Sequence, residues 1–130
     1  MGKDIILIIG ASSDIGLNLI RSISDEALII AHFNSSNKNL LELSKKISNE
    51  LVTLKADLSK EEETNNLIDS IEINYGIPNK IVHLTANKVA NIRFKDVSWS
   101  DFERDINISL RSTVLILNRF LPKMAKQKTI

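Results

Sequence analysis

The sequence predicts an α/β fold: a Rossmann-like, doubly wound parallel sheet with strand order 3-2-1-4 and helices on both faces. Strand-like and helix-like segments alternate along the chain without a linker or a repeat, which is typical of βαβ units. Residues 5–9 are a run of branched apolar residues, as expected for a strand that is buried on both faces. A turn bounded by glycines, residues 10–16, follows this strand and leads into a helix-like segment.

Three further strands are predicted at residues 27–33, 51–56 and 80–85, where apolar residues are again continuous. Between the second and third strands, apolar residues at helical spacing predict a helix whose buried face consists of Leu40, Leu43, Ser44 and Ile47. The right-handed crossovers of such units place the first two helices on one face of the sheet and the next two on the other.

A capping-box pattern, Ser59 with Glu62, predicts the start of the third helix. Gly76 and Pro78 are expected to end it. Its apolar face is expected to contain Leu67, Ile68, Ile71 and Tyr75.

A long fourth helix is expected to begin near Ser98 or Ser100. One side of it is expected to carry Phe102, Ile106, Thr113, Val114, Leu117 and Leu121. This stripe is wider than one sheet face needs, and the fourth strand would be an edge strand. We therefore expect self-association into a homo-oligomer, a dimer or larger.

Composition limits the classes of function. The 130 residues (14.6 kDa) are expected to form one domain, residues 1–130, that buries about two-thirds of its unfolded surface. A net charge of +1 without a basic stripe does not indicate nucleic acid as a partner, and the absence of cysteine excludes disulfides and thiolate sites. The first apolar run is too short for a signal peptide or a membrane span, so a cytoplasmic location is expected.

The turn at residues 10–16 has the features of a phosphate-binding turn. Gly10 permits a tight reversal at the strand end, and Gly16 permits close packing of helix and sheet, so that the free N–H groups of the helix face a ligand such as a dinucleotide pyrophosphate. No Gly-Lys-Ser/Thr follows, so the turn is not a Walker A loop. The turn alone is equally compatible with a tight strand-to-helix connection of any α/β protein.

Asp14 stands where a further glycine is common. A carboxylate about 5 Å from a phosphate oxygen would be opposed by roughly 3 kcal/mol at an effective dielectric constant near 20. We therefore expect Asp14 to point away and to cap the first helix. Ser12 and Ser13 would then remain to bind the phosphates.

Several ordered motifs together resemble the short-chain dehydrogenases/reductases over nearly the whole chain. Residues 10–16 (Gly-Ala-Ser-Ser-Asp-Ile-Gly) resemble the glycine motif of this family, with Asp14 in place of the middle glycine. Asp57-Leu58 resembles the segment that holds the adenine ring. Residues 83–86 (His-Leu-Thr-Ala) stand where the classical branch of this family has Asn-Asn-Ala-Gly, and they are closer to the His-Leu-Ala-Ala of its sugar-nucleotide branch. Residues 121–124 (Leu-Pro-Lys-Met) are similar to the end of the fourth helix of the family.

The resemblance implies an NAD(P)(H)-dependent oxidoreductase that transfers hydride between the cofactor and a carbonyl or alcohol carbon. It assigns cofactor binding to Gly10, Ser12, Ser13, Ile15, Gly16, Asn34, Ser35, Asp57, Leu58, Thr85 and Ala86. No acidic residue ends the second strand, and the residues that follow, with Lys38 nearby, offer hydroxyl and amide donors; NADP(H) is therefore favoured over NAD(H). His32 and His83 do not suggest a metal pair, and no metal site is expected.

The catalytic residues of the family are mostly missing. Counted from Phe102, the position of its catalytic Asn falls on Ser109, while Asn107 lies two residues earlier and is turned by roughly 200° on an ideal helix. The only tyrosine is Tyr75, and Asn79 follows it instead of the lysine of Tyr-x-x-x-Lys. The chain is therefore expected to be the cofactor-binding half, truncated before the fifth strand and inactive alone.

Two alternatives remain. A non-catalytic nucleotide-binding module is compatible with the missing tyrosine. A receiver domain with Asp57 as the phosphoacceptor is disfavoured, because no acidic pair stands at the end of the first strand to hold Mg²⁺.

Overall fold

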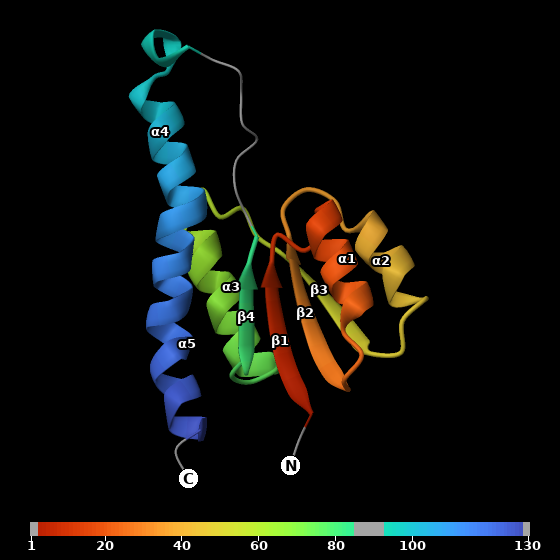
Figure 1. Ribbon diagram of the computed structural model, residues 1–130. Helices are drawn as coiled ribbons and strands as arrows, with labels where there is room; N and C mark the ends of the chain where they lie inside the picture. The colour runs from red at the N-terminus through yellow and green to blue at the C-terminus, as the bar shows by residue number, and fades with distance from the viewer. Residues whose placement is uncertain (1–2, 85–92, 129–130) are drawn as a thin grey trace.

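The computed structural model describes residues 3–84 and 93–128. In this part of the chain, parallel strands form one sheet in the order β3-β2-β1-β4, as predicted (Figure 1). The strands are β1 (Asp4–Ile9), β2 (Ala27–Phe33), β3 (Glu50–Lys55) and β4 (Lys80–His83).

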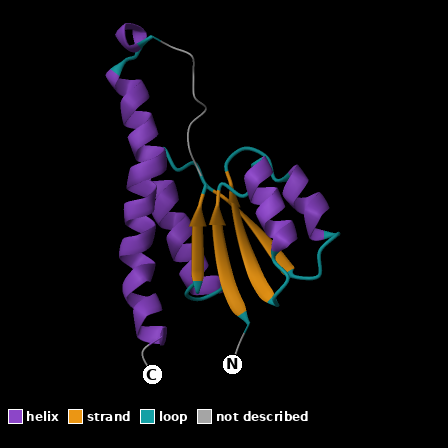
Figure 2. Cartoon of the chain, viewed as in Figure 1, coloured by secondary structure: helices purple, strands orange, loops and turns teal. Residues whose placement is uncertain are grey.

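Helices cover both faces of this sheet (Figure 2). Helices α1 (Asp14–Ser22) and α2 (Lys38–Ser44) lie on one face, and α3 (Glu61–Asn74) and α5 (Ser112–Lys128) lie on the other. A 3-10 turn, η1 (Phe94–Asp96), precedes α4 (Trp99–Asp105), and a π-helical segment, η2 (Ile106–Arg111), joins α4 to α5. The doubly wound arrangement is therefore confirmed.

The two faces of the sheet bury alternate residues of the same strands, because successive side chains of a strand point to opposite sides. Ile6 and Ile8 of β1 pack with α1 and α2, whereas Leu7 and Ile9 pack with α3 and α5. All four are buried, which explains why β1 reads as a continuous apolar run.

The long helix begins where the sequence predicts, but it packs on a different face. Ser98 caps α4, and its side chain and that of Asp101 form a reciprocal capping box. The residues that this helix buries are Ile108, Ser112, Ile116 and Phe120. In the predicted stripe Thr113 is half-buried and the apolar members are exposed. The prediction missed the buried face because the helix is apolar on two sides and the buried side includes a serine.

Two predicted helix starts are wrong. Ser13, and not Asp14, caps α1: its Oγ accepts a hydrogen bond from the Gly16 N–H at 3.1 Å. Helix α3 begins after Lys60 without a side-chain cap, because the Ser59 hydroxyl donates to Asp57 Oδ1 at 2.6 Å instead. In addition, α2 ends at Ser44, so Ile47 packs against the core from the segment that follows the helix.

Among the helices of residues 3–84 and 93–128, none combines the length and the apolar character that a membrane span requires.

Candidate nucleotide-binding site

The carboxyl ends of β1, β2 and β3 meet at one edge of the sheet, where α1 also begins (Figure 1). The turn out of β1 depends on Gly10, whose φ of +80° lies in the left-handed region that favours glycine. This turn places the start of α1 directly above the end of β1.

Gly16 brings α1 close to the turn. A Cβ built on Gly16 would lie 2.4 Å from the backbone oxygen of Ala11 and 2.7 Å from its carbonyl carbon. Backbone atoms cannot move aside as a flexible side chain can, so only glycine fits. The two bounding glycines therefore have the separate roles that the motif predicts, one for conformation and one for packing.

The start of α1 offers free backbone donors. The Ser13 side chain satisfies the Gly16 N–H and itself donates to the Gly10 carbonyl at 3.0 Å. Within residues 3–84 and 93–128, the N–H groups of Ser12, Asp14 and Ile15 donate to no acceptor. Free N–H groups at a helix N-terminus form an anion-binding arrangement.

The Asp14 and Ile15 side chains are exposed, and Asp14 is the first residue of α1. Ser13 is engaged as the cap, so a phosphate would meet the backbone donors and the half-buried Ser12.

His32 connects the turn to the neighbouring strands. The residue is 2% exposed, and its Nδ1 accepts a hydrogen bond from the Gly10 N–H at 3.1 Å. Its Nε2 lies 2.9 Å from the carbonyl oxygen of Ala56, the residue before Asp57. Burial lowers the pKa of His32, and the nearby His83 lowers it further, against the opposing effect of the Ala56 bond.

Asp57 and Leu58 follow β3 at the same edge. Asp57 Oδ1 accepts hydrogen bonds from the Ser59 N–H at 3.0 Å and the Ser59 hydroxyl at 2.6 Å, and the hydroxyl bond is the main cause that lowers the pKa of Asp57. The Asp57 N–H donates to Glu63 Oε1 at 2.9 Å. Leu58 is buried in the core. The carboxylate is thus held by its own loop, with its backbone fixed to α3.

The remaining predicted residues are placed as follows. Asn34 and Ser35 are exposed after β2, and Lys38 is exposed at the start of α2. Thr85 and Ala86 lie outside the described residues. Ser109 is exposed within η2 and donates its hydroxyl to the Asp105 carbonyl at 2.6 Å.

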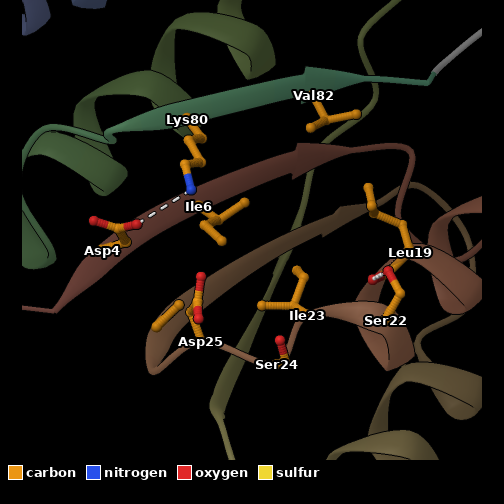
Figure 3. Close-up of a pocket in the computed structure, with 10 residues that line it drawn as sticks. Asp4, Ile6, Leu19, Ser22, Ile23, Ser24, Asp25, Lys80 and Val82 are labelled. Atoms are coloured by element: carbon orange, nitrogen blue, oxygen red, sulfur yellow. Dashed lines mark hydrogen bonds and ion pairs between the residues drawn. The ribbon is translucent and has the colours of Figure 1, made fainter.

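At least three cavities in the described part contain no residue of the turn, and two of them matter for the placement of a ligand. One, of about 430 Å³, lies beside the loop after Asp57 and is lined in part by Ser59, Arg104 and Asn107. The other, of about 250 Å³, lies between β1, β4 and the end of α1, beside the Asp4–Lys80 ion pair (Figure 3). That cavity is at the amino ends of the strands, opposite the turn.

The family of the chain is decided by a sequence comparison. Residues 4–129 match the family model described as short chain dehydrogenase. The chain belongs to the short-chain dehydrogenase/reductase family. The resemblance inferred from the motifs is thereby confirmed, and the receiver-domain interpretation of Asp57 has no support.

Solved structures share the fold at low sequence identity. L-Sorbose reductase from Gluconobacter frateurii, complexed with NADPH and L-sorbose, has a TM-score of 0.83 at 17% identity over 98% of this chain and 49% of that chain. A blue fluorescent protein from a metagenomic library, in complex with NADPH, has a TM-score of 0.80 at 20% identity over 93% and 51% of the two chains. An NADH-dependent reductase, A1-R′, complexed with NAD, has a TM-score of 0.77 at 16% identity over 96% and 55%.

The chain thus spans about half the length of the structures that it matches. A comparison with curated proteins gives no match.

Sequence reasoning missed two residues that shape this edge. His32 interrupts an apolar strand directly before a polar turn, and a histidine in a strand buried on both faces is a signal that could have been used. Arg111 of η2 donates from Nη2 to the Ser59 carbonyl at 2.9 Å and so ties the long helix to the Asp57 loop. No local pattern in the sequence indicates that contact.

The stability of the protein is expected to fall as the pH falls through about 6.5. Burial lowers the pKa values of both His32 and His83 from an ordinary value of 6.5. In this range the unfolded chain therefore binds protons that the folded chain does not, so acid favours unfolding. Asp57, whose pKa is also lowered, loses its contribution only at still lower pH.

Urea denaturation at pH 7.5 and pH 5.5 measures this change. The free energy of unfolding should be smaller at pH 5.5, and His32→Asn should show a weaker pH dependence than the parent. An unchanged or larger free energy of unfolding at pH 5.5 would contradict the assignment of neutral, buried histidines.

Proposed function

We propose that this chain is the cofactor-binding half of a short-chain dehydrogenase/reductase and binds NADP(H) at the carboxyl ends of β1, β2 and β3. The observation that carries the proposal is the turn itself. Gly10 at positive φ, Gly16 against the backbone of Ala11, and the free amides at the start of α1 together form a pyrophosphate-binding arrangement.

The residues after β2 support NADP(H) over NAD(H). Asn34, Ser35 and Lys38 are exposed there, and the segment 32–38 contains no carboxylate. An ammonium group together with hydroxyl and amide donors suits a 2′-phosphate, whereas a carboxylate would accept hydrogen bonds from both ribose hydroxyls. Of the three similar structures named above, two contain NADPH and one contains NAD.

The reaction that we propose for the whole protein is hydride transfer between the nicotinamide and a carbonyl or alcohol carbon. Ser109 stands at the position of the family Asn, and we propose that it holds the water of the proton relay. The chain has no Tyr-x-x-x-Lys, because Tyr75 is followed four residues later by Asn79. We therefore propose that the 130 residues alone bind the cofactor weakly and do not transfer hydride.

Titration calorimetry of the 130-residue chain with NADPH and with NADH tests this function. The expected result is saturable binding, tighter for NADPH. Lys38→Ala should weaken NADPH binding and leave NADH binding unchanged. Lys45→Ala, an exposed lysine just after α2, is the matched control and should change neither.

A second measurement follows oxidation of NADPH at 340 nm with a panel of aldehydes and ketones. We expect no turnover. If the chain did transfer hydride, the proton could not depend on a Tyr-x-x-x-Lys pair, and our proposal that this chain is inactive alone would be wrong. If it bound neither nucleotide, the proposal as a whole would be wrong.

Self-association is also proposed. The exposed face of the long helix carries an apolar stripe that contains Leu110, Val114, Leu117 and Leu121. In the described part of the chain, β4 pairs only with β1 and is an edge strand. An apolar helix face and a free strand edge both favour association between copies.

Light scattering over a dilution series is expected to show a dimer or larger species. The double variant Leu110→Lys, Leu117→Lys should shift it to monomer, because both side chains are exposed and a charge there opposes burial. Gln127→Lys, at an exposed position beyond the stripe, should have no effect. A strictly monomeric parent chain at micromolar concentration would contradict this proposal.

A further inference from the structure

His32 occupies a position between two parts of the proposed binding site. The backbone pairing of β1 with β2 runs to Ile8 and Ala31, and that of β2 with β3 to Phe33 and Lys55. Beyond these pairs, the imidazole of His32 contacts the first residue after β1 on one side and Ala56, the first residue after β3, on the other. The imidazole therefore joins the residue that follows β1 to the residue that follows β3 across the end of β2.

Backbone contacts of the same region reinforce this connection. The Ala11 N–H donates to the His32 carbonyl at 2.9 Å, and the Ala56 N–H donates to the Phe33 carbonyl at 3.1 Å. Gly10 and Ala11 open the turn that we propose for the phosphates, and Ala56 directly precedes the Asp57 that we propose for the adenine. The relative position of these two segments thus depends on the end of β2.

The two partners fix the protonation of the ring. A backbone N–H can only donate, so Nδ1 must carry no proton, and a backbone carbonyl can only accept, so Nε2 must carry one. A proton added to Nδ1 would face the Gly10 N–H and break that bond. The contact therefore exists only with a neutral ring.

We propose that His32 is a positioning residue that couples the phosphate-binding turn to the adenine-binding loop and so sets the nucleotide affinity without touching the nucleotide. This inference rests on the proposed function. It adds a residue, at the carboxyl end of β2, that the cofactor-binding motif does not contain.

Two substitutions separate the two contacts of the ring. In His32→Asn, Oδ1 takes the place of Nδ1 and can still accept from Gly10. In His32→Gln, Nε2 takes the place of the ring Nε2 and can still donate to Ala56, but the Gly10 N–H loses its acceptor. Both variants are polar and smaller than histidine, so general loss of packing affects them similarly.

Calorimetry with NADPH at pH 7.5 is expected to show both variants weaker than the parent, because each keeps only one of the two contacts. We expect a loss of about threefold for His32→Asn, which leaves the Ala56 carbonyl without the ring, and of about tenfold for His32→Gln, which leaves the buried Gly10 N–H unpaired. Affinity of the parent should also fall as the pH is lowered below 6.5, with His32→Asn less sensitive. His83 is the other titratable group that acts on His32, and its Nε2 lies 2.8 Å from the Ser112 Oγ on α5; His83→Asn should keep the pH dependence. Parent-like NADPH affinity of either variant would overturn the proposal, because the contact which that variant lacks would then not contribute to binding.

Nuclear magnetic resonance of the chain without nucleotide separates this inference from the proposed function. We expect a neutral His32 ring with its proton on Nε2, and slow exchange of the Gly10 amide in the parent and in His32→Asn but faster exchange in His32→Gln. A proton on Nδ1, or equal Gly10 exchange in the two variants, would overturn the coupling. If the parent chain binds no nucleotide, the proposed function fails, and these spectra alone decide whether His32 holds the turn.

Discussion

Gly16→Ala is expected to lower the free energy of unfolding by about 3 kcal/mol and to abolish NADPH binding. The new Cβ would lie 2.4 Å from the Ala11 oxygen and 2.7 Å from the Ala11 Cα, so either α1 or the turn must move. That movement displaces the free N–H groups at the start of the helix. Urea denaturation and titration calorimetry measure the two effects.

Asn18→Ala is the matched control for this change, since Asn18 is exposed on the same helix and alanine favours helix formation. It should leave both stability and affinity close to those of the parent. Parent-like stability of Gly16→Ala would show that the helix does not pack against the turn as closely as the structure has it.

Gly10→Val is expected to abolish nucleotide binding. A β-branched side chain is strongly disfavoured at a φ of +80°, and the left-handed region alone costs about 1–2 kcal/mol for a residue with a Cβ. The turn must therefore change its conformation, and the branched side chain would also occupy the space above β1 in which we propose the pyrophosphate. Calorimetry of the variant and the parent with NADPH measures the loss.

Gly76→Val separates backbone strain from loss of the site. Gly76 also has positive φ, at +107°, but it lies between α3 and β4 at the amino ends of the strands, and the nearest side chain to an added Cβ is Ile5 at 3.8 Å. Both valine variants should lose stability, and only Gly10→Val should lose binding. Equal affinities of Gly10→Val and the parent would show that the turn is structural only.

Much of the fold follows from local sequence patterns. The continuous apolar run in β1 is explained by burial on both faces, and alternating elements with right-handed crossovers lead to the order β3-β2-β1-β4. The predicted start of the long helix near Ser98 or Ser100 is confirmed: Ser98 caps α4, and Asp101 stands at the reciprocal position of the capping box.

The errors arise where several groups compete for one partner. Ser13 and Asp14 can both cap α1, and only the path of the turn decides that Ser13 does so. Ser59 can cap α3, but the Asp57 carboxylate accepts its hydroxyl instead. The long helix is apolar on two faces, and contacts with α3 decide that Ile116 and Phe120 face the core.

The candidate site is predictable in its glycines and less so in its supporting contacts. Gly10 and Gly16 can be read from the motif because each is required by backbone geometry within a few residues. His32 and Arg111 act on residues more than twenty positions away, Gly10 and Ser59 respectively. Such long-range contacts leave no periodic pattern in the sequence.

Mapping of backbone amide chemical shifts during an NADPH titration tests most directly where the nucleotide binds. The largest changes are predicted at Ser12, Asp14 and Ile15, whose N–H groups are free at the start of α1, with smaller changes at Asn34 and Asp57. Residues that line the cavity at the opposite edge, such as Ile23 and Lys80, should not shift. Changes centred on that cavity or on the exposed apolar stripe of the long helix, with none at residues 10–16, would contradict the placement of the dinucleotide at the carboxyl ends of the strands.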